Sequence, residues 1–411
     1  MSDEAGAVSG ASAGNEAGAS APGEAGTGVD AARPVTPLEL FFDLVFVFAL
    51  TQVTALMADD LTWAGLVRGF AVLAVIWWAW GGYAWLTNTI RIDADVASRL
   101  VMLLAMAAML LVGLAAPQAF GAYSILFGAA YLLVRLLHIS LYVVSTRHDK
   151  EVSRAVMRLV PGMVVAPLFV LAAGFVPAGP IRAALWAAAI VIDFGALLVA
   201  GTRGWRVHAS HFTERHGLII IIALGESVVA LGVSAAGEEL TPGVVIAAFL
   251  GVVVTSAMWW LYFDVVALVA EKRLTALSGT QQTSMARDSY TFIHMFLVFG
   301  IVLVALGLKK TLLDIDSPLK AVAAVALFGG VALYLVAHIA FRLRNVGTLN
   351  RQRLVAAAII LALLPAGLVL PSLASLSLVT VVLVVLVTYE AVHFKAARHA
   401  VRDHEGEMRS N

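Results

Sequence analysis

From Pro37 to about residue 394 the chain alternates between long apolar runs and short polar stretches. An apolar run of about 20 residues can cross a bilayer as a helix, since a helix rises about 1.5 Å per residue and the hydrocarbon layer is about 30 Å thick. The pattern predicts an all-α polytopic membrane protein. Its twelve predicted spans are residues 38–57, 65–87, 98–116, 120–143, 157–175, 181–201, 215–235, 242–265, 288–308, 320–342, 353–370 and 374–394.

Composition agrees with this class. The chain is 61% hydrophobic and 13% charged, whereas soluble domains carry about 25% charged residues, and its mean hydropathy is +0.92. Formal net charge is zero, so nothing points to nucleic acid as a partner. There is no cysteine, which excludes disulfides and thiolate metal sites. The lipid bilayer of the cell membrane is the expected surrounding, and no cofactor is predicted.

Two polar segments flank the apolar region. Residues 1–33 are rich in Ala, Gly, Ser and Glu and cannot bury a core, so we expect a disordered tail. This segment lacks the basic start and apolar stretch of a secretory signal peptide. Residues 396–411 are predicted to form a cytoplasmic tail.

The basic residues between the predicted spans are unevenly distributed. The side that carries the amino terminus receives 21 of the 27 Lys and Arg residues, the opposite side receives five, and Arg135 lies inside a span. Cytoplasmic loops of membrane proteins are enriched in Lys and Arg. Both termini are therefore predicted to be cytoplasmic, in agreement with an even number of spans.

The two halves of the chain, residues 37–203 and 204–395, carry similar residues in the same order. Six spans in each half is an even number, so the halves would be parallel repeats about an axis along the membrane normal. Transporters often place their substrate site at such an interface. The matches are Gln52 with Glu226, Trp77-Trp78 with Trp259-Trp260, His138 with His338, and Asp193 with Glu390.

Three motifs point to a known family. Residues 39–49 read ELFFDLVFVFA, residues 214–226 read ERHGLIIIIALGE, and a third motif joins Trp77-Trp78-x-Trp80 to Thr87-Asn88 and Asp93. These motifs resemble those of the low-temperature-requirement A (LtrA) family of bacterial membrane proteins, and the resemblance covers roughly residues 34–395. It implies a polytopic membrane protein whose molecular activity is poorly defined within the family itself.

The first predicted span begins with two carboxylates on one face. Thr36 and Glu39 have the spacing of a capping box, with Pro37 at the first helical position. Asp43 lies one turn deeper, where a carboxylate usually has a partner or a function. If both carboxylates lie at the membrane surface, the helix dipole accounts for the presence of Glu39 at the start of the helix. The same explanation fits Asp43 less well, because Asp43 is one turn deeper.

Glu226 is the candidate for proton coupling. It follows Glu214 by twelve residues, or about 18 Å along a helix, which places it near mid-membrane. A carboxyl that exchanges a proton there would suit a proton-linked transporter. The alternative is a permanently protonated Glu226 that bonds to a neighbouring helix. Gln52, its match in the first half, is polar and cannot titrate.

Arg135 and His138 lie three residues apart inside the fourth span and share a helix face. An arginine at this depth needs a counter-ion, and Asp193 is the predicted partner. In the second half, His338 and Glu390 are predicted to form the equivalent pair. Two interpretations remain open. The buried pair sets the register of the helices, or the histidine takes part in a proton or substrate relay.

Charged and polar residues also gather at the predicted cytoplasmic ends. They form either an ordinary surface salt-bridge network or a vestibule that gates a central path. The candidates are Asn88, Arg91, Asp93, Asp95 and Arg99, together with Glu39, Asp43, Arg215, His216 and Asp264. Glu214 is a candidate for the proton or substrate pathway.

Three functions fit these features. The first is a proton-linked secondary transporter of an unknown small solute, since the chain has no phosphate-binding loop of an ATPase. The second is an intramembrane enzyme that acts on a lipid or isoprenoid. The third is a non-catalytic membrane stress-adaptation factor, in which all interior polar groups should be paired with one another.

Overall fold

The structure, a computed structural model, describes residues 34–92, 95–236 and 239–393. The predicted tails at residues 1–33 and 396–411 lie outside these ranges. Within them the chain is helical, without a strand beyond an isolated bridge between Pro318 and Pro371. The all-α prediction is confirmed for the described residues.

The first group of helices begins mostly at capping side chains. Thr36 and Glu39 form the predicted capping box, and Thr62, Asp95 and Asp149 cap the helices that follow them. Hydrogen bonds from the Ser98 backbone and side chain lower the pKa of Asp95, which is fully exposed. The helices are α1 (Pro37–Asp59), α2 (Trp63–Thr89), α3 (Val96–Ala115) with the short η2 (Ala116–Gln118), α4 (Ser124–Thr146), α5 (Lys150–Gly174) and α6 (Pro180–Ala200).

The second group contains two π-helical segments, each of which interrupts a long helix. Such segments are rare and often mark functional positions. The elements are α7 (Ala209–Ala236), α8 (Pro242–Phe263), α9 (Val266–Thr275), α10 (Gly279–Met285), η3 (Ala286–Ile293), α11 (His294–Leu313), α12 (Ala321–Ala324), η4 (Val325–Gly329), α13 (Gly330–Val346), α14 (Arg351–Gly367) and α15 (Ser372–His393). The π-helical segments are η3 and η4.

The described residues contain eleven helices that are long and apolar enough to span a membrane, one fewer than predicted. The missing one is α14, which the sequence pattern placed at residues 353–370. It has 17 residues and ends at Gly367, before Pro371 and the start of α15. The apolar run was longer than the helix because its last residues form the turn that precedes α15.

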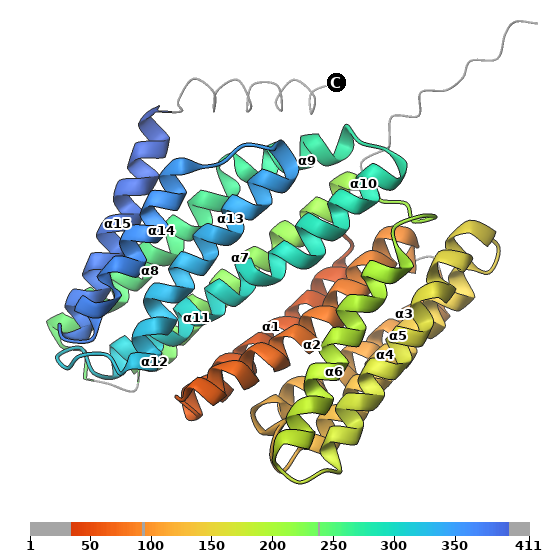
Figure 1. The fold of residues 1–411 in the computed structure, drawn as a ribbon, viewed down its shortest axis with the longest axis horizontal. Helices are drawn as coiled ribbons and strands as arrows, with labels where there is room; N and C mark the ends of the chain where they lie inside the picture. Colours follow the sequence, from red (N-terminus) through yellow and green to blue (C-terminus); the bar gives the residue numbers. More distant parts are fainter. Residues whose placement is uncertain (1–33, 93–94, 237–238, 394–411) are drawn as a thin grey trace, which may run out of the picture. The chain divides into compact units, whose positions relative to one another are not determined.

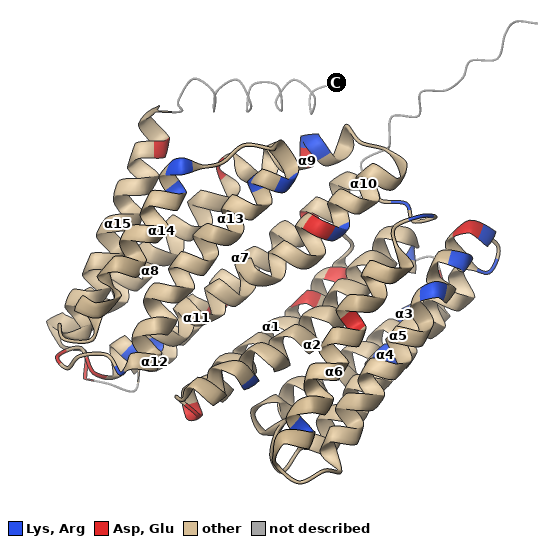
Figure 2. Ribbon diagram, in the orientation of Figure 1, with Lys and Arg blue, Asp and Glu red and all other residues tan. Residues whose placement is uncertain are grey.

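Each group packs in the same order (Figure 1). In the first, α1 contacts α2 and α3, α3 contacts α4, α4 contacts α5, and α5 contacts α6. In the second, α7 contacts α8 and α11, α11 contacts α13, α13 contacts α14, and α14 contacts α15. Contacts of α1 and α2 with α7 and α11 join the groups. Most charged residues lie on the parts of the ribbon near the helix ends, with fewer between them (Figure 2).

Candidate functional site

A cavity of about 60 Å³ lies among α2, α4, α5 and α6, and η3 of the second group contributes to its wall. This volume has room for about four water molecules. Its polar wall includes the ion pair that the sequence predicted, and aromatic rings make much of the rest. The lining includes Trp78, Gly81, Gly82, Trp85, Arg135, His138, Tyr142, Leu159, Met163, Asp193, Leu197, Trp205, Arg287 and Thr291.

The Arg135–Asp193 pair is confirmed. Arg135 Nη2 lies 3.3 Å from Asp193 Oδ1, and the two side chains are 1% and 3% exposed. The Tyr131 hydroxyl donates to Asp193 Oδ2 at 2.9 Å, and Arg135 Nη1 reaches the Trp78 carbonyl oxygen at 3.5 Å. Both carboxylate oxygens of Asp193 therefore have a donor, as a buried charge requires.

Five buried polar atoms that belong to cavity-lining residues have no hydrogen-bond partner among the described residues. They are Arg135 Nε, His138 Nδ1 and Nε2, Tyr142 Oη and Trp205 Nε1. The Thr89 hydroxyl beside Tyr142 donates to the Trp85 carbonyl oxygen at 2.9 Å, and its own oxygen can still accept a hydrogen bond. Leaving such a group unsatisfied costs about 1–3 kcal/mol, and most buried polar groups are bonded. These lining residues therefore carry hydrogen-bonding atoms that the described part of the fold leaves unused, although the atoms themselves are buried.

His138 is held by its packing. Its ring lies between Tyr83 and Tyr142, with centroid distances of 5.0 Å to each, and it rests on Gly82. A Cβ at Gly82 would lie 2.7 Å from His138 Cε1, so only glycine lets α2 approach this closely. Gly82, Tyr142 and Trp205 were not predicted as site residues from the sequence. The Gly81-Gly82 pair within an aromatic helix was the signal that could have pointed to this contact.

The π-helical segment η3 is bonded to α2 at the cavity. Trp77 Nε1 donates to the Thr291 carbonyl oxygen and Trp85 Nε1 to the Thr291 hydroxyl, both at 2.8 Å. Thr291 also lines the cavity. A segment of the second half thus completes a pocket of the first half, which the sequence pattern did not reveal.

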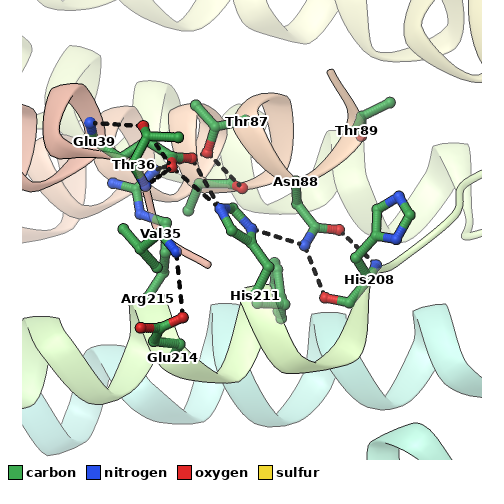
Figure 3. A network of polar contacts seen from close by, with 12 residues as sticks. Val35, Thr36, Glu39, Thr87, Asn88, Thr89, His208, His211, Glu214 and Arg215 are labelled. Atoms are coloured by element: carbon green, nitrogen blue, oxygen red, sulfur yellow. Dashed lines mark hydrogen bonds and ion pairs between the residues drawn. The ribbon is translucent and has the colours of Figure 1, made fainter. Parts of the chain in front are cut away.

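A second polar cluster joins α1 to α7 at the start of α1 (Figure 3). Glu39 Oε1 lies 3.0 Å from His211 Nε2 and 3.7 Å from Arg215 Nη1. Asp43 accepts from Trp80 Nε1 at 2.8 Å and pairs closely with Arg215. Glu39, Asp43 and Arg215 are at most 3% exposed, so an ordinary surface salt-bridge network is the wrong description of this cluster.

Asn88 fixes the tautomer of His211. Asn88 Oδ1 accepts from the His208 backbone N–H, so Asn88 Nδ2 must be the atom that faces His208 O and His211 Nδ1. Nδ2 is a donor, so His211 Nδ1 accepts and its Nε2–H donates to Glu39. The imidazole is therefore neutral in this arrangement, and the cluster extends from α1 through α7 to α2 (Figure 3).

The other candidates differ from one another in burial. Exposed Glu214 accepts from the Val35 backbone N–H at 3.3 Å, and His216 is buried, with Nδ1 bonded to the Phe212 carbonyl oxygen at 2.8 Å. Asp264 is buried and follows α8 as its C-cap. The remaining candidates are Arg91 and Arg99, which are exposed, and Asp93, which lies outside the described residues.

Glu226 is buried where the two groups of helices meet. It is 2% exposed, and its Oε2 accepts a short hydrogen bond from the Thr51 hydroxyl on α1. Gln52, its proposed match, is the next residue along α1. Glu226 is not among the lining residues of the cavity.

The predicted pair of His338 with Glu390 is wrong. Glu390 pairs with Arg353, with Nη2 and Oε2 2.8 Å apart, and also accepts from Asn350 at 3.3 Å. Neither ring nitrogen of His338 has a hydrogen-bond partner among the described residues. Glu390 lies near the end of α15, where Arg353 in the first turn of α14 is close enough to reach it.

This arrangement of long apolar helices around buried ion pairs defines a polytopic helical membrane protein. Residues 34–388 match the sequence pattern described as bacterial low temperature requirement A protein (LtrA), and the chain belongs to that family. It is 29% identical over 283 residues to a protein of Rhizobium meliloti (strain 1021) called Uncharacterized protein RA0937, covering 66% of this chain and 67% of that protein. No solved structure matches the chain.

Proposed function

We propose that this protein is a secondary transporter of a small solute and that the cavity at Arg135, His138 and Asp193 is part of its path. The observation that carries the proposal is the set of unpartnered polar atoms on cavity-lining residues, four of which belong to the membrane-length helix α4. Ionisable groups at such depth are costly, and they commonly mark the path of a substrate or an ion. A purely structural membrane factor would have these groups paired with one another.

The packing order supports a parallel repeat of two halves. In each group the first helix contacts the second and third, and the later helices contact one another in sequence. The groups meet through α1 and α2 on one side and α7 and α11 on the other. Such an arrangement lets one half rock against the other during alternating access.

We further propose twelve crossings with both termini in the cytoplasm. α14 begins at Arg351, close to Glu390 at the end of α15, and the turn after it is bonded to the segment after α11 through Ser372 N–H and Ser317 O at 3.0 Å. Contacts at both its ends favour α14 as a short crossing antiparallel to α15. Together with the excess of Lys and Arg on the amino-terminal side, this favours cytoplasmic termini in the bacterial cell membrane.

Glu226 is our candidate for proton coupling, because it is buried at the junction of the halves and bonded across it to Thr51. Glu226→Gln keeps the shape of the side chain and removes its titration. We expect normal expression and thermal stability but no coupling of transport to a pH gradient. Proton-driven transport that Glu226→Gln leaves intact would assign Glu226 a structural role alone.

Transport itself can be tested without a known substrate. Membrane vesicles from cells with and without the full chain would be incubated in a mixture of cellular small molecules, and their contents compared by mass spectrometry. We expect one class of small solute to accumulate only with the wild-type protein. Vesicles with the wild-type protein, vesicles with the Arg135→Gln variant and vesicles without the protein are compared. If all three contain the same small molecules, the protein is not a transporter.

A lipid-modifying enzyme is the second candidate, and one feature favours it. A groove of about 500 Å³ lies between α5 and α6, lined by Arg158, Gly162, Ile192 and Ala196 among others. Ala196 also lines the cavity, so a single helix separates the two. A change in lipid composition of vesicles that contain the wild-type protein, without solute accumulation, would favour this function.

A further inference from the structure

We propose that the α5–α6 groove binds an anionic phospholipid, with the phosphate of the headgroup at Arg158 and an acyl chain along the groove. This site goes beyond the proposed function, because a lipid held between two helices at the protein surface does not require that a solute crosses the membrane. Three features of the molecule support it: the shape of the groove, the basic residues at one end of it and the exposure of α6.

The groove is a hollow of about 500 Å³, and every residue that lines it except Arg158 is apolar. Its base is the contact between α5 and α6 at Gly162, where an added Cβ would lie 2.4 Å from the Ala196 Cβ. Gly162 is buried, whereas Val165 on α5 and Val199 on α6 are exposed and form the two rims. An open hollow with apolar walls suits an apolar chain.

Arg158 lies where the headgroup of such a lipid would be. It is eight residues from the start of α5, and Val165 lies seven residues, or about 10 Å, farther along the helix. Arg158 Nη2 donates to the Arg203 carbonyl oxygen just after α6, which fixes the side chain at this end of the groove. A guanidinium carries five N–H donors, so four remain for a ligand. Because Arg158 is exposed and lines the groove, a lipid phosphate can reach it and accept paired hydrogen bonds from it.

Basic residues outnumber acids at this end of the groove. Residues 147–158 and 203–206 contain six Lys and Arg residues and two acids. Both acids pair with Arg206, which lies 3.4 Å from Asp149 and 3.8 Å from Glu151. The other five basic residues form no ion pair with an acid in the described part of the chain. Basic pockets between membrane helices are typical binding sites for anionic lipid headgroups.

The exposure of α6 requires an occupant from outside this chain's described helices. Only 17% of its most apolar stretch is buried, against 39% to 78% in the other ten membrane-length helices. A second copy related by a two-fold axis along the membrane normal would bring the same arginines together. Like charges that face each other across an interface oppose association. An anionic lipid neutralises these charges, so charge favours the lipid over a second copy.

The test is native mass spectrometry of the purified full chain, delipidated in a neutral detergent and titrated with phosphatidylglycerol. Phosphatidylcholine with the same acyl chains is the comparison, because it carries the phosphate and the chains but no net negative charge. We expect the first phosphatidylglycerol to bind at least about fivefold more tightly. Glycerol phosphate, which has the headgroup charge without a chain, should not displace the bound lipid.

Arg158→Gln tests the headgroup contact. It should weaken binding of the first phosphatidylglycerol about fivefold, the effect of one basic residue near an anionic membrane surface, and leave phosphatidylcholine binding unchanged. Arg351→Gln is the matched control. Arg351 is exposed at the start of α14, is predicted to lie on the same side of the membrane and does not line the groove, so its loss should leave the first binding step unchanged.

Val165→Phe tests the acyl-chain contact by filling the groove. We expect about tenfold weaker phosphatidylglycerol binding, equivalent to losing burial of about two methylene groups. Val191→Phe is the control, because Val191 on α6 is also an exposed valine but does not line the groove. Both valines are exposed, so thermal unfolding should show that both variants remain as stable as the wild type.

The outcomes separate this site from the proposed function. Equal affinity for the two lipids, displacement by glycerol phosphate, or equal losses in variants and controls would overturn the lipid site. A dimer that Val165→Phe dissociates while lipid binding is unchanged would also overturn it, since a second copy would then occupy the groove. None of these measurements involves a solute, so such results leave the transporter intact. Conversely, vesicles that accumulate no solute would contradict transport and leave the lipid site in place.

Discussion

His138 and His338 occupy similar surroundings in the two halves, yet the structures around them differ. Each ring is buried, packs beside two tyrosines and has no hydrogen-bond partner among the described residues. His138 lines a cavity with an ion pair, whereas His338 lines neither that cavity nor the α5–α6 groove. The two halves therefore share a helix arrangement but differ in the polar groups they enclose.

One position accounts for much of the difference. Arg135 lies three residues before His138, and the corresponding position before His338 is Leu335, which is fully buried. With Arg135 present, Asp193 is held deep in the first half. With leucine at the equivalent position, Glu390 pairs with Arg353 near the helix ends, where the side chains are 6% and 15% exposed. In both pairs the acid lies where an arginine can reach it, as a buried charge requires.

The largest expected effect comes from breaking the deeper pair. Asp193→Ala leaves Arg135 charged and unpaired in the interior and should destabilise the protein by about 3–5 kcal/mol. Glu390→Ala should cost clearly less, because Arg353 is near the helix end and can be solvated. Thermal unfolding of both variants in detergent measures the contrast. If both variants lose the same amount of stability, the depth of an ion pair in the helix bundle does not determine how much the pair contributes.

The double variant Asp193→Leu with Arg135→Leu sharpens this result, since it makes the first half resemble the second. Replacing a buried ion pair by apolar residues is often neutral or stabilising by about 1–4 kcal/mol. We expect stability to recover relative to Asp193→Ala while solute accumulation is lost. A double variant that transports normally would remove the ion pair from the proposed path.

A smaller effect is expected from the glycine pair on α2. Gly82→Ala places a Cβ 2.7 Å from His138 Cε1 and 3.3 Å from Arg135 Nη1, so the cavity wall must shift at a cost of about 1–3 kcal/mol. Gly81→Ala is the control, because its Cβ would meet no atom within 4 Å. Thermal stability of the two alanine variants checks the prediction, and equal stability would contradict the close approach at Gly82.

The smallest change in stability is expected at the histidines themselves. His138→Leu and His338→Leu remove ring nitrogens that make no hydrogen bond within the described structure, so each should change stability by less than about 1.5 kcal/mol. Their functional effects should differ: His138→Leu should abolish solute accumulation, and His338→Leu should preserve it. Loss of accumulation in both variants would show that the second half also contributes a path.

The sequence determined the elements that depend on local chemistry and on the bilayer. Apolar length predicted the helices, and the Thr36–Glu39 spacing predicted the capping box that the structure contains. Arg135 inside a span required an acid at similar depth, which identified Asp193. These inferences succeeded because each depends on helix geometry or on the cost of an unpaired charge in an apolar interior.

Other features were decided only by the tertiary structure. The helix of the eleventh predicted span is shorter than its apolar run, because the chain turns toward α15 after Gly367, before the run ends. Glu390 pairs with Arg353 and not with the predicted partner His338. The hydrogen bond from Asn88 determines the tautomer of His211. Both contacts join residues that are far apart in the sequence. Gly82 lets α2 approach His138 closely, and the cavity is lined by residues of α2, α4, α5, α6 and η3 that are far apart in the sequence. A pattern along one helix cannot specify which side chains of its neighbours will face it, because that depends on how the helices cross and rotate against one another.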